Sequence, residues 1–92
     1  MAVEVRIPTV LRSHVGGKAS VDAEGSTIGE VLAHLGEEYP ALRGQLVSDG
    51  GELHRFVNVY LNDEDVRYLD KLDTKVSDGD VVTILPAVAG GF

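Results

Sequence analysis

The chain has 92 residues, of which 43% are apolar and 5% aromatic, and it has a formal net charge of −7 and no cysteine. This length suits one small domain, and the negative charge argues against a nucleic-acid or anionic-membrane partner, because both would repel it. The lack of cysteine excludes disulfides, thiolate metal sites and a cysteine nucleophile. No apolar run reaches the roughly 18 residues of a membrane span, and the first ten residues do not resemble a signal peptide, so we expect a cytoplasmic protein.

The first two predicted elements are strands. Ala2–Leu11 alternates apolar and polar residues at the period of a half-buried strand, although Pro8 indicates that part of its backbone lacks a central partner. Gly16 and Gly17 can adopt the positive φ of a tight hairpin turn, and Lys18–Glu24 is predicted to return as a shorter strand. These two strands should be antiparallel neighbours.

The clearest predicted helix follows, in the stretch STIGEVLAHLGEEYP. Thr27 can cap its N-terminus, Glu30 three residues later can complete a capping box, and Pro40 ends the helix. One apolar stripe predicts that a single face of this helix packs on a sheet. The stripe consists of Ile28, Val31, Leu32 and Leu35. Ala41–Val47 is expected to add a short helical turn before a flexible loop at Ser48–Glu52.

The remaining elements are predicted strands and turns. His54–Leu61 alternates as a strand, Asn62–Asp65 is a turn, and Val66–Leu69 is a brief edge strand. A turn at Ser77–Asp80 then leads to the last strand, Val81–Leu85. This order predicts an α+β roll, in which one main helix packs on one face of a mixed five-stranded sheet and the first and last strands pair at its centre.

The side chains of this domain do not predict an active site. His14, His34 and His54 lie in three different predicted elements without companions at metal-ligand spacing, so we interpret them as surface or packing residues. The stretch NDEDVRYLD lacks the alternating ligands and the terminal glutamate of a calcium loop, and no serine lies in a nucleophile-elbow context. The body of the domain therefore shows no active site and no metal site.

The C-terminal end has a different character. Residues 1–86 are predicted to form the domain, and residues 87–92, AVAGGF, a flexible tail. Five residues after Pro86 can extend roughly 17 Å at about 3.4 Å each, and glycines without Cβ can pass through a narrow tunnel. The residues expected to thread a partner's active site are Val88, Ala89 and Gly90. The group presented for chemistry would be the carboxylate of Gly91, although a short glycine tail can equally be a frayed terminus.

The segment DGDVVTILPAVAGG, residues 78–91, resembles the end of the ubiquitin-like sulfur carriers of the MoaD and ThiS type. A closer likeness, to the carriers of this family that serve cysteine biosynthesis, involves VRIPTVLRSHVGGK at 5–18, LHRFVNVYLNDEDVR at 53–67 and VTILPAVAGG at 82–91. The resemblance implies a β-grasp fold, which agrees with the predicted order of elements. It also implies a protein that is a substrate of other enzymes.

The resemblance further implies the chemistry of Gly91 and the partners. An E1-like adenylating enzyme of the MoeB or ThiF type would activate Gly91 with ATP, and sulfur would then displace the adenylate to leave a thiocarboxylate. The acceptor would be a pyridoxal-phosphate-dependent cysteine synthase, and a zinc metallopeptidase of the JAMM class would release the product. A main-chain sulfur site also fits a chain without cysteine.

Phe92 departs from the simplest family pattern, which ends on the second glycine. Because Phe92 occupies the carboxylate that must be adenylated, we expect a JAMM-type peptidase to remove it before activation. The alternative is an artefact of the gene model.

Strand parity predicts an apolar docking patch beside the tail. The residues expected to face the helix are Val57, Val59, Leu61, Val82 and Ile84. Those expected on the opposite face, as the partner-docking patch, are Pro8, Phe56, Tyr60 and Leu85. Scattered surface apolar residues are the competing interpretation. Surrounding carboxylates would steer a basic partner toward this face.

Three other functions are compatible with the sequence. Within the same chemistry, the sulfur could go to molybdopterin or thiamine synthesis. A protein modifier would instead be joined through activated Gly91 to lysines of target proteins. A plain binding module with an idle tail would lose nothing if residues 90–92 were removed.

Overall fold

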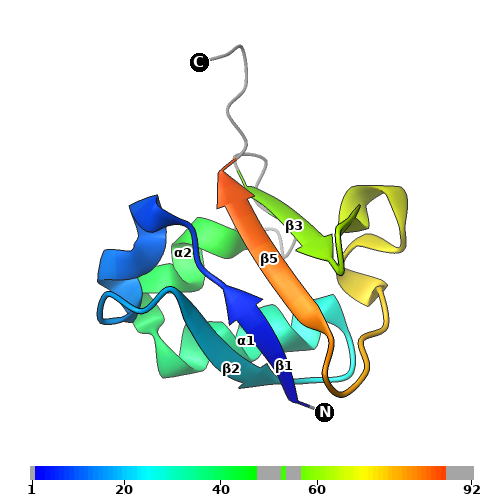
Figure 1. The fold of residues 1–92 in the computed structure, drawn as a ribbon, viewed down its shortest axis with the longest axis horizontal. Coiled ribbons are helices and arrows are strands. Elements are labelled where there is room, and N and C mark those ends of the chain that lie inside the picture. Colours follow the sequence, from blue (N-terminus) through cyan, green and yellow to red (C-terminus); the bar gives the residue numbers. More distant parts are fainter. Residues whose placement is uncertain (1, 48–52, 54–56, 87–92) are drawn as a thin grey trace.

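The computed structural model describes residues 2–47, 53 and 57–86. The predictions on the loop at 48–52, on Phe56 and on the tail at 87–92 lie outside these residues. Five strands form one mixed sheet in the order β2-β1-β5-β3-β4, with α1 behind it in Figure 1. The strands are β1 (Ala2–Arg6), β2 (Ser20–Glu24), β3 (Val57–Leu61), β4 (Glu64–Asp65) and β5 (Val81–Pro86).

The expected mixed five-stranded sheet with one main helix on one face is confirmed. β1 and β5 run parallel at the sheet centre, and the other neighbouring pairs are antiparallel. The main helix α1 (Ile28–Glu38) is followed by a 3₁₀ turn (Pro40–Leu42) and the short helix α2 (Arg43–Leu46). The further 3₁₀ helices are η1 (Thr9–Val15), η3 (Val66–Tyr68) and η4 (Lys71–Asp73).

The core lies between α1 and one face of the sheet, as the apolar stripe of the helix predicts. Burying these side chains together removes apolar surface from water, which is the main favourable contribution to folding. The four stripe residues are Ile28, Val31, Leu32 and Leu35, and all are buried. The sheet residues predicted to face them also have the expected parity: Val57, Val59, Val82 and Ile84 are buried, and Leu61 is partly buried against the same core.

The prediction of a first strand extending to Leu11 and closing in a tight hairpin is wrong. β1 ends at Arg6, and Pro8 is the N-cap residue that precedes η1. Proline has no N–H, so it cannot donate a hydrogen bond to a neighbouring strand and does not continue β1. Gly16 and Gly17 do adopt positive φ, at 70° and 82°, but they close η1, with both N–H groups donating to the Arg12 carbonyl. The connection between the two strands therefore packs a helical turn against the core.

The predicted edge strand at Val66–Leu69 is also wrong. Asn62 and Asp63 adopt φ of 49° and 78°, which makes a two-residue turn and places Glu64 directly opposite Leu61. The return strand is consequently the short β4. Asp65 then caps η3, because its carboxylate accepts the Arg67 N–H at 2.9 Å.

The cap of α1 gives a direct test of the predicted helix start. The Thr27 hydroxyl oxygen accepts the Glu30 N–H at 3.2 Å, and the Glu30 carboxylate accepts the Ser26 N–H at 2.7 Å. We expect Thr27→Ala to lower the free energy of unfolding by about 1 kcal/mol, because one helical N–H loses its partner. Urea denaturation measures this loss, with Thr27→Ser as the control that retains the hydroxyl. A T27A midpoint equal to that of the parent would show that the cap contributes nothing.

Candidate functional site

The candidate site lies where β5 ends, immediately before the predicted tail. Pairing between β1 and β5 stops at Arg6 opposite Thr83, whereas β3 follows β5 to its last residue, with Val57 opposite Pro86. Beyond Thr83, β5 therefore separates from β1 but keeps β3 beside it. Figure 1 shows this end of β5 at the margin of the sheet.

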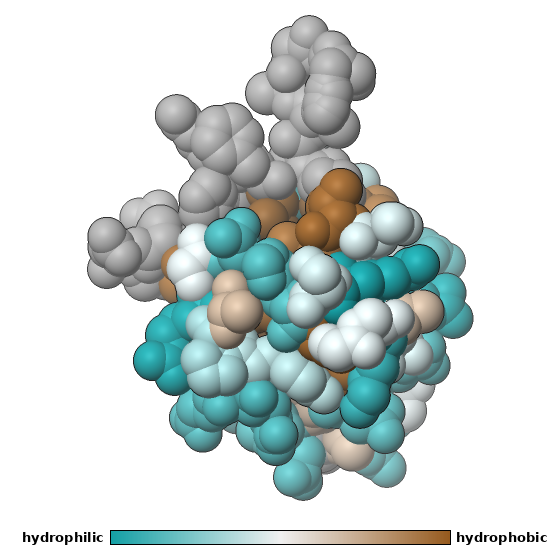
Figure 2. Space-filling view, turned by 90° about the vertical axis from the view of Figure 1, so that its left-hand side faces the viewer, coloured by the Kyte–Doolittle hydropathy of each residue, from teal (hydrophilic) through white to brown (hydrophobic). Residues whose placement is uncertain are grey.

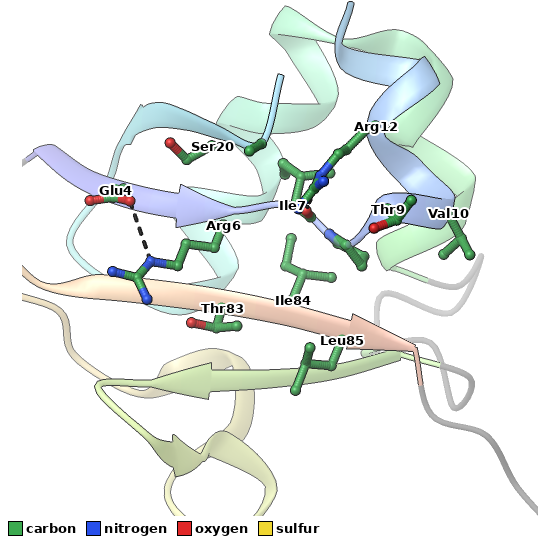
Figure 3. A pocket seen from close by; sticks show the side chains of 12 residues that line it. Glu4, Arg6, Ile7, Thr9, Val10, Arg12, Ser20, Thr83, Ile84 and Leu85 are labelled. Atoms are coloured by element: carbon green, nitrogen blue, oxygen red, sulfur yellow. Dashed lines mark hydrogen bonds and ion pairs between the residues drawn. The ribbon is translucent and has the colours of Figure 1, made fainter. Parts of the chain in front are cut away.

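The separation of β1 and β5 leaves a hollow of about 560 Å³ on the sheet. Figure 3 shows Ile7, Thr9 and Val10 on one side, and Thr83 and Leu85 on the other. The hollow results from the turn at Pro8, which takes the chain away from the sheet into η1. A strand continuing to Leu11, as the periodicity predicts, would have extended the pairing with β5 beyond Arg6 and Thr83 and filled this space.

Two hydrogen bonds of the turn support the β1 side of the hollow. The Arg12 guanidinium donates from Nε to the Ile7 carbonyl at 3.0 Å, and the Leu11 N–H donates to the Pro8 carbonyl at 2.9 Å. Ile7 itself is buried and donates its N–H to the Ala19 carbonyl at 2.8 Å. This side of the hollow is therefore anchored to the core and to the connection that follows.

The structure brings together two of the four predicted patch residues. Pro8 and Leu85 line the hollow, and Leu85 is 42% exposed, as its strand parity predicts. Tyr60 lies on the same face opposite Thr83, but it does not line the hollow. Phe56 lies outside the described residues. In the space-filling view, apolar atoms gather at the end of the molecule where β5 finishes (Figure 2).

Val10 is a site residue that the sequence reasoning missed. It lines the hollow beside Pro8 and is 66% exposed. The sequence prediction placed Val10 within a continuous strand, Ala2–Leu11. It therefore treated Val10 as a paired residue of the sheet and not as part of a surface hollow. The proline two residues earlier is the only sequence signal that could have moved Val10 out of the strand.

Charged side chains of both signs also line the hollow, namely Glu4, Arg6 and Arg12. Glu4 and Arg6 project from β1, and the Arg6 Nε lies 3.4 Å from the Glu4 carboxylate, with both side chains largely exposed. A pair exposed to this degree contributes little to stability. Asp22 lies opposite Glu4 on β2 and is exposed. The hollow therefore combines apolar residues near the end of β5 with charged residues of both signs from β1 and η1.

The two described histidines lie in different elements, α1 and η1. The His34 Nδ1 accepts the Glu24 N–H at 3.0 Å, so this side chain ties α1 to the end of β2. His14 lies within η1 and is half-buried, and His54 falls outside the described residues. Over the described part of the chain, no three His, Cys, Asp or Glu residues come together in a way that could hold a metal ion. Within the same residues, every helix is too short or too polar to cross a membrane.

Comparison with known proteins identifies the family. The ThiS family model matches residues 5–91. The sulfur carrier protein CysO of Mycobacterium tuberculosis is 55% identical over 93 residues, covering 99% of this chain and all of that protein. Small archaeal modifier protein 3 of Haloferax volcanii is 42% identical over 94 residues, with the same coverage.

The solved structures agree with the sequence relatives. CysO in the crystal structure of the Amycolatopsis orientalis BexX/CysO complex is 50% identical, with a TM-score of 0.89, covering 97% of this chain and 99% of that chain. The expected β-grasp, ubiquitin-like fold is confirmed. The chain therefore belongs to the ThiS family, and it is a CysO-like sulfur carrier protein rather than an enzyme.

Proposed function

We propose that this carrier holds sulfur as a thiocarboxylate on Gly91 and delivers it for cysteine biosynthesis, after Phe92 has been removed. The observation that carries the proposal is the position of the apolar hollow, which lies beside Leu85 at the end of β5, five residues before Gly91. A partner that binds this surface would have the tail within reach of its active site. The 55% identity to CysO of M. tuberculosis supports the cysteine pathway in particular.

The proposed chemistry converts an unreactive acid into a sulfur donor in two steps. The Gly91 carboxylate attacks the α-phosphorus of ATP on an E1-like enzyme, and pyrophosphate leaves. A sulfur nucleophile then attacks the acyl carbon, and AMP leaves, so that one carboxylate oxygen is replaced by sulfur. The thiocarboxylate sulfur would next add to an aminoacrylate in a pyridoxal-phosphate-dependent cysteine synthase. A JAMM-class zinc peptidase would hydrolyse the resulting link between Gly91 and cysteine.

The role of the described domain in this scheme is docking. Leu85, Pro8 and Val10 supply exposed apolar surface around the hollow, and apolar contacts at the centre of an interface contribute most of its binding energy. The tail residues Val88, Ala89 and Gly90 would pass into the partner's active site. The net charge of −7 would steer a partner that has a basic surface toward this domain.

The experiment that tests the proposal uses the protein ending at Gly91. It is converted with an adenylating enzyme, ATP and a sulfide source, and is then offered to a cysteine synthase with O-phosphoserine. We expect intact mass to show the replacement of one oxygen by sulfur, followed by loss of the thiocarboxylate and appearance of a cysteine adduct. A chain ending at Ala89 is the matched control and should do neither. A thiocarboxylate that survives this synthase but is consumed by a molybdopterin or thiamine synthesis enzyme would assign the other pathways.

Protein modification is the second candidate, because a small archaeal modifier protein is 42% identical to this chain over nearly its whole length. In that case, the activated Gly91 carbonyl would be attacked by a lysine amine of a target protein, and the leaving group would depart to give an isopeptide bond. The test is to activate the protein in a cell extract and to look for adducts on other proteins. Adducts that survive treatment with thiols and that join Gly91 to a lysine would support this function. Their absence, together with cysteine formation, would favour the sulfur pathway.

A further inference from the structure

The start of β3 and the end of β5 pair at one corner of the sheet. Val57 lies opposite Pro86, and Asn58 lies opposite Leu85. Residue 87 follows this corner directly. Val57 and Asn58 are therefore the partners that hold the last two residues of β5 on this side.

On its other side, β3 has little support at this corner. Within the described residues, β4 pairs with β3 only at Tyr60 and Leu61, so no strand lies beside Val57 and Asn58 on that side. In an antiparallel sheet the backbone groups of a strand alternate between its two neighbours, and an unpaired edge is exposed to water or to another partner. Among the described residues, this part of the β3 edge is therefore available to a polar group from elsewhere in the chain or to water.

Arg67 supplies that group. Its guanidinium donates from Nη2 to the Val57 carbonyl at 2.8 Å and from Nη1 to Oδ1 of Asn58. The side chain is half-buried, and it comes from η3, whose start is fixed by the bond from the Arg67 N–H to the Asp65 carboxylate. One rigid, planar group thus connects η3 to both residues that pair with the end of β5. A lysine ammonium lacks this fork geometry.

The location of the bond to Asn58 places Arg67 at the docking face. Residues directly opposite each other in a sheet project from the same face, so the Asn58 side chain lies beside that of Leu85. Arg67 therefore brings its guanidinium to the Asn58 side chain, on the sheet face that carries the hollow. The partner that docks on Leu85 would meet an edge already held in place.

We propose that Arg67 is a positioning residue for the carrier reaction, because it braces the start of β3 against the end of β5 and so fixes the path of the tail into a partner's active site. This inference rests on the proposed function of Gly91. If the end of β5 is held in place, the tail that continues from it has less conformational freedom to lose when it enters the partner. Once the tail is bound, the partner holds it, so the brace should affect association more than the chemical step.

The test compares Arg67→Gln and Arg67→Lys in chains ending at Gly91. We expect R67Q to raise the KM for thiocarboxylate formation roughly fivefold to tenfold with kcat unchanged, the factor that corresponds to ordering about one more residue on binding. R67K can reach one of the two acceptors, so its KM should lie between those of R67Q and the parent. If R67Q does not fold, R67K alone decides, and a KM equal to that of the parent would overturn the proposal.

The control is Thr27→Ala, which weakens the fold at a distance from the corner. Thr27 follows Glu24, and Glu24 pairs with Ala2 at the start of β1, so it lies at the opposite end of the sheet from Pro86. T27A should leave the KM at the parental value although it also lowers stability. A T27A effect as large as that of R67Q would show that general destabilisation, and not the brace, raises the KM, and would overturn the proposal.

A second measurement does not depend on sulfur chemistry. Backbone ¹⁵N relaxation of the free protein should show that the Leu85 and Asn58 amides become more mobile in R67Q but not in T27A. If the parent forms no thiocarboxylate, the proposed function fails, and this measurement still decides the brace. Unchanged relaxation at both amides in R67Q would overturn it.

Discussion

The 92-residue chain, with Phe92 in place, is expected to yield no thiocarboxylate, whereas the protein ending at Gly91 is converted. The reason is chemical: with Phe92 present, the Gly91 carbonyl is part of a peptide bond and offers no carboxylate oxygen to ATP. The family model matches residues 5–91 and therefore leaves Phe92 outside. Intact mass after incubation with the adenylating enzyme, ATP and sulfide, without peptidase, measures the difference.

The control for this experiment separates the peptide bond from the aromatic ring. Phe92→Gly keeps the bond but removes the ring, so it should be as inactive as the parent. Adding a JAMM-class peptidase that removes residue 92 should restore conversion of the 92-residue chain. Thiocarboxylate formed on Gly91 of the intact chain, without any cleavage, would contradict the proposal that Phe92 must be removed.

Leu85→Asp is expected to weaken binding of the adenylating enzyme roughly 30-fold, the equivalent of about 2 kcal/mol for a central apolar contact of an interface. The side chain is 42% exposed beside the hollow, so a carboxylate there meets the partner's apolar surface without entering this domain's core. The free energy of unfolding should stay close to that of the parent. Titration calorimetry gives the affinity, and urea denaturation gives the stability.

Two further variants define the docking surface. Val10→Asp, on the other side of the hollow, should weaken binding in the same direction, because Val10 is 66% exposed and lines the same space. Tyr68→Asp is the matched control, since Tyr68 is 87% exposed but does not line the hollow, and it should bind like the parent. Equal binding by L85D and the parent would exclude the hollow as the docking surface. Loss of the fold in L85D would show that Leu85 contributes to the core.

The candidate site could be predicted only in part. Alternation within β3 and β5 correctly placed Leu85 on the face away from α1, because side-chain parity is a local property of a strand. The hollow itself could not be predicted, since it depends on β1 leaving the sheet at Arg6 while β5 continues to Pro86. Arg67 gave no sequence signal, because its acceptors on β3 lie nine and ten residues earlier in the chain.

The sequence by itself determined the elements whose cause is local: the cap and apolar stripe of α1, the alternation of the central strands, and the diglycine pattern that resembles the family. Only the tertiary structure decided where β1 ends, that the return strand is Glu64–Asp65, and that Pro8, Val10 and Leu85 share one hollow. The physical reason is that these features are set by competition between segments for the same core and sheet edge. A periodic pattern shows which face of a helix or strand is apolar, but not which other segment will pack beside that element.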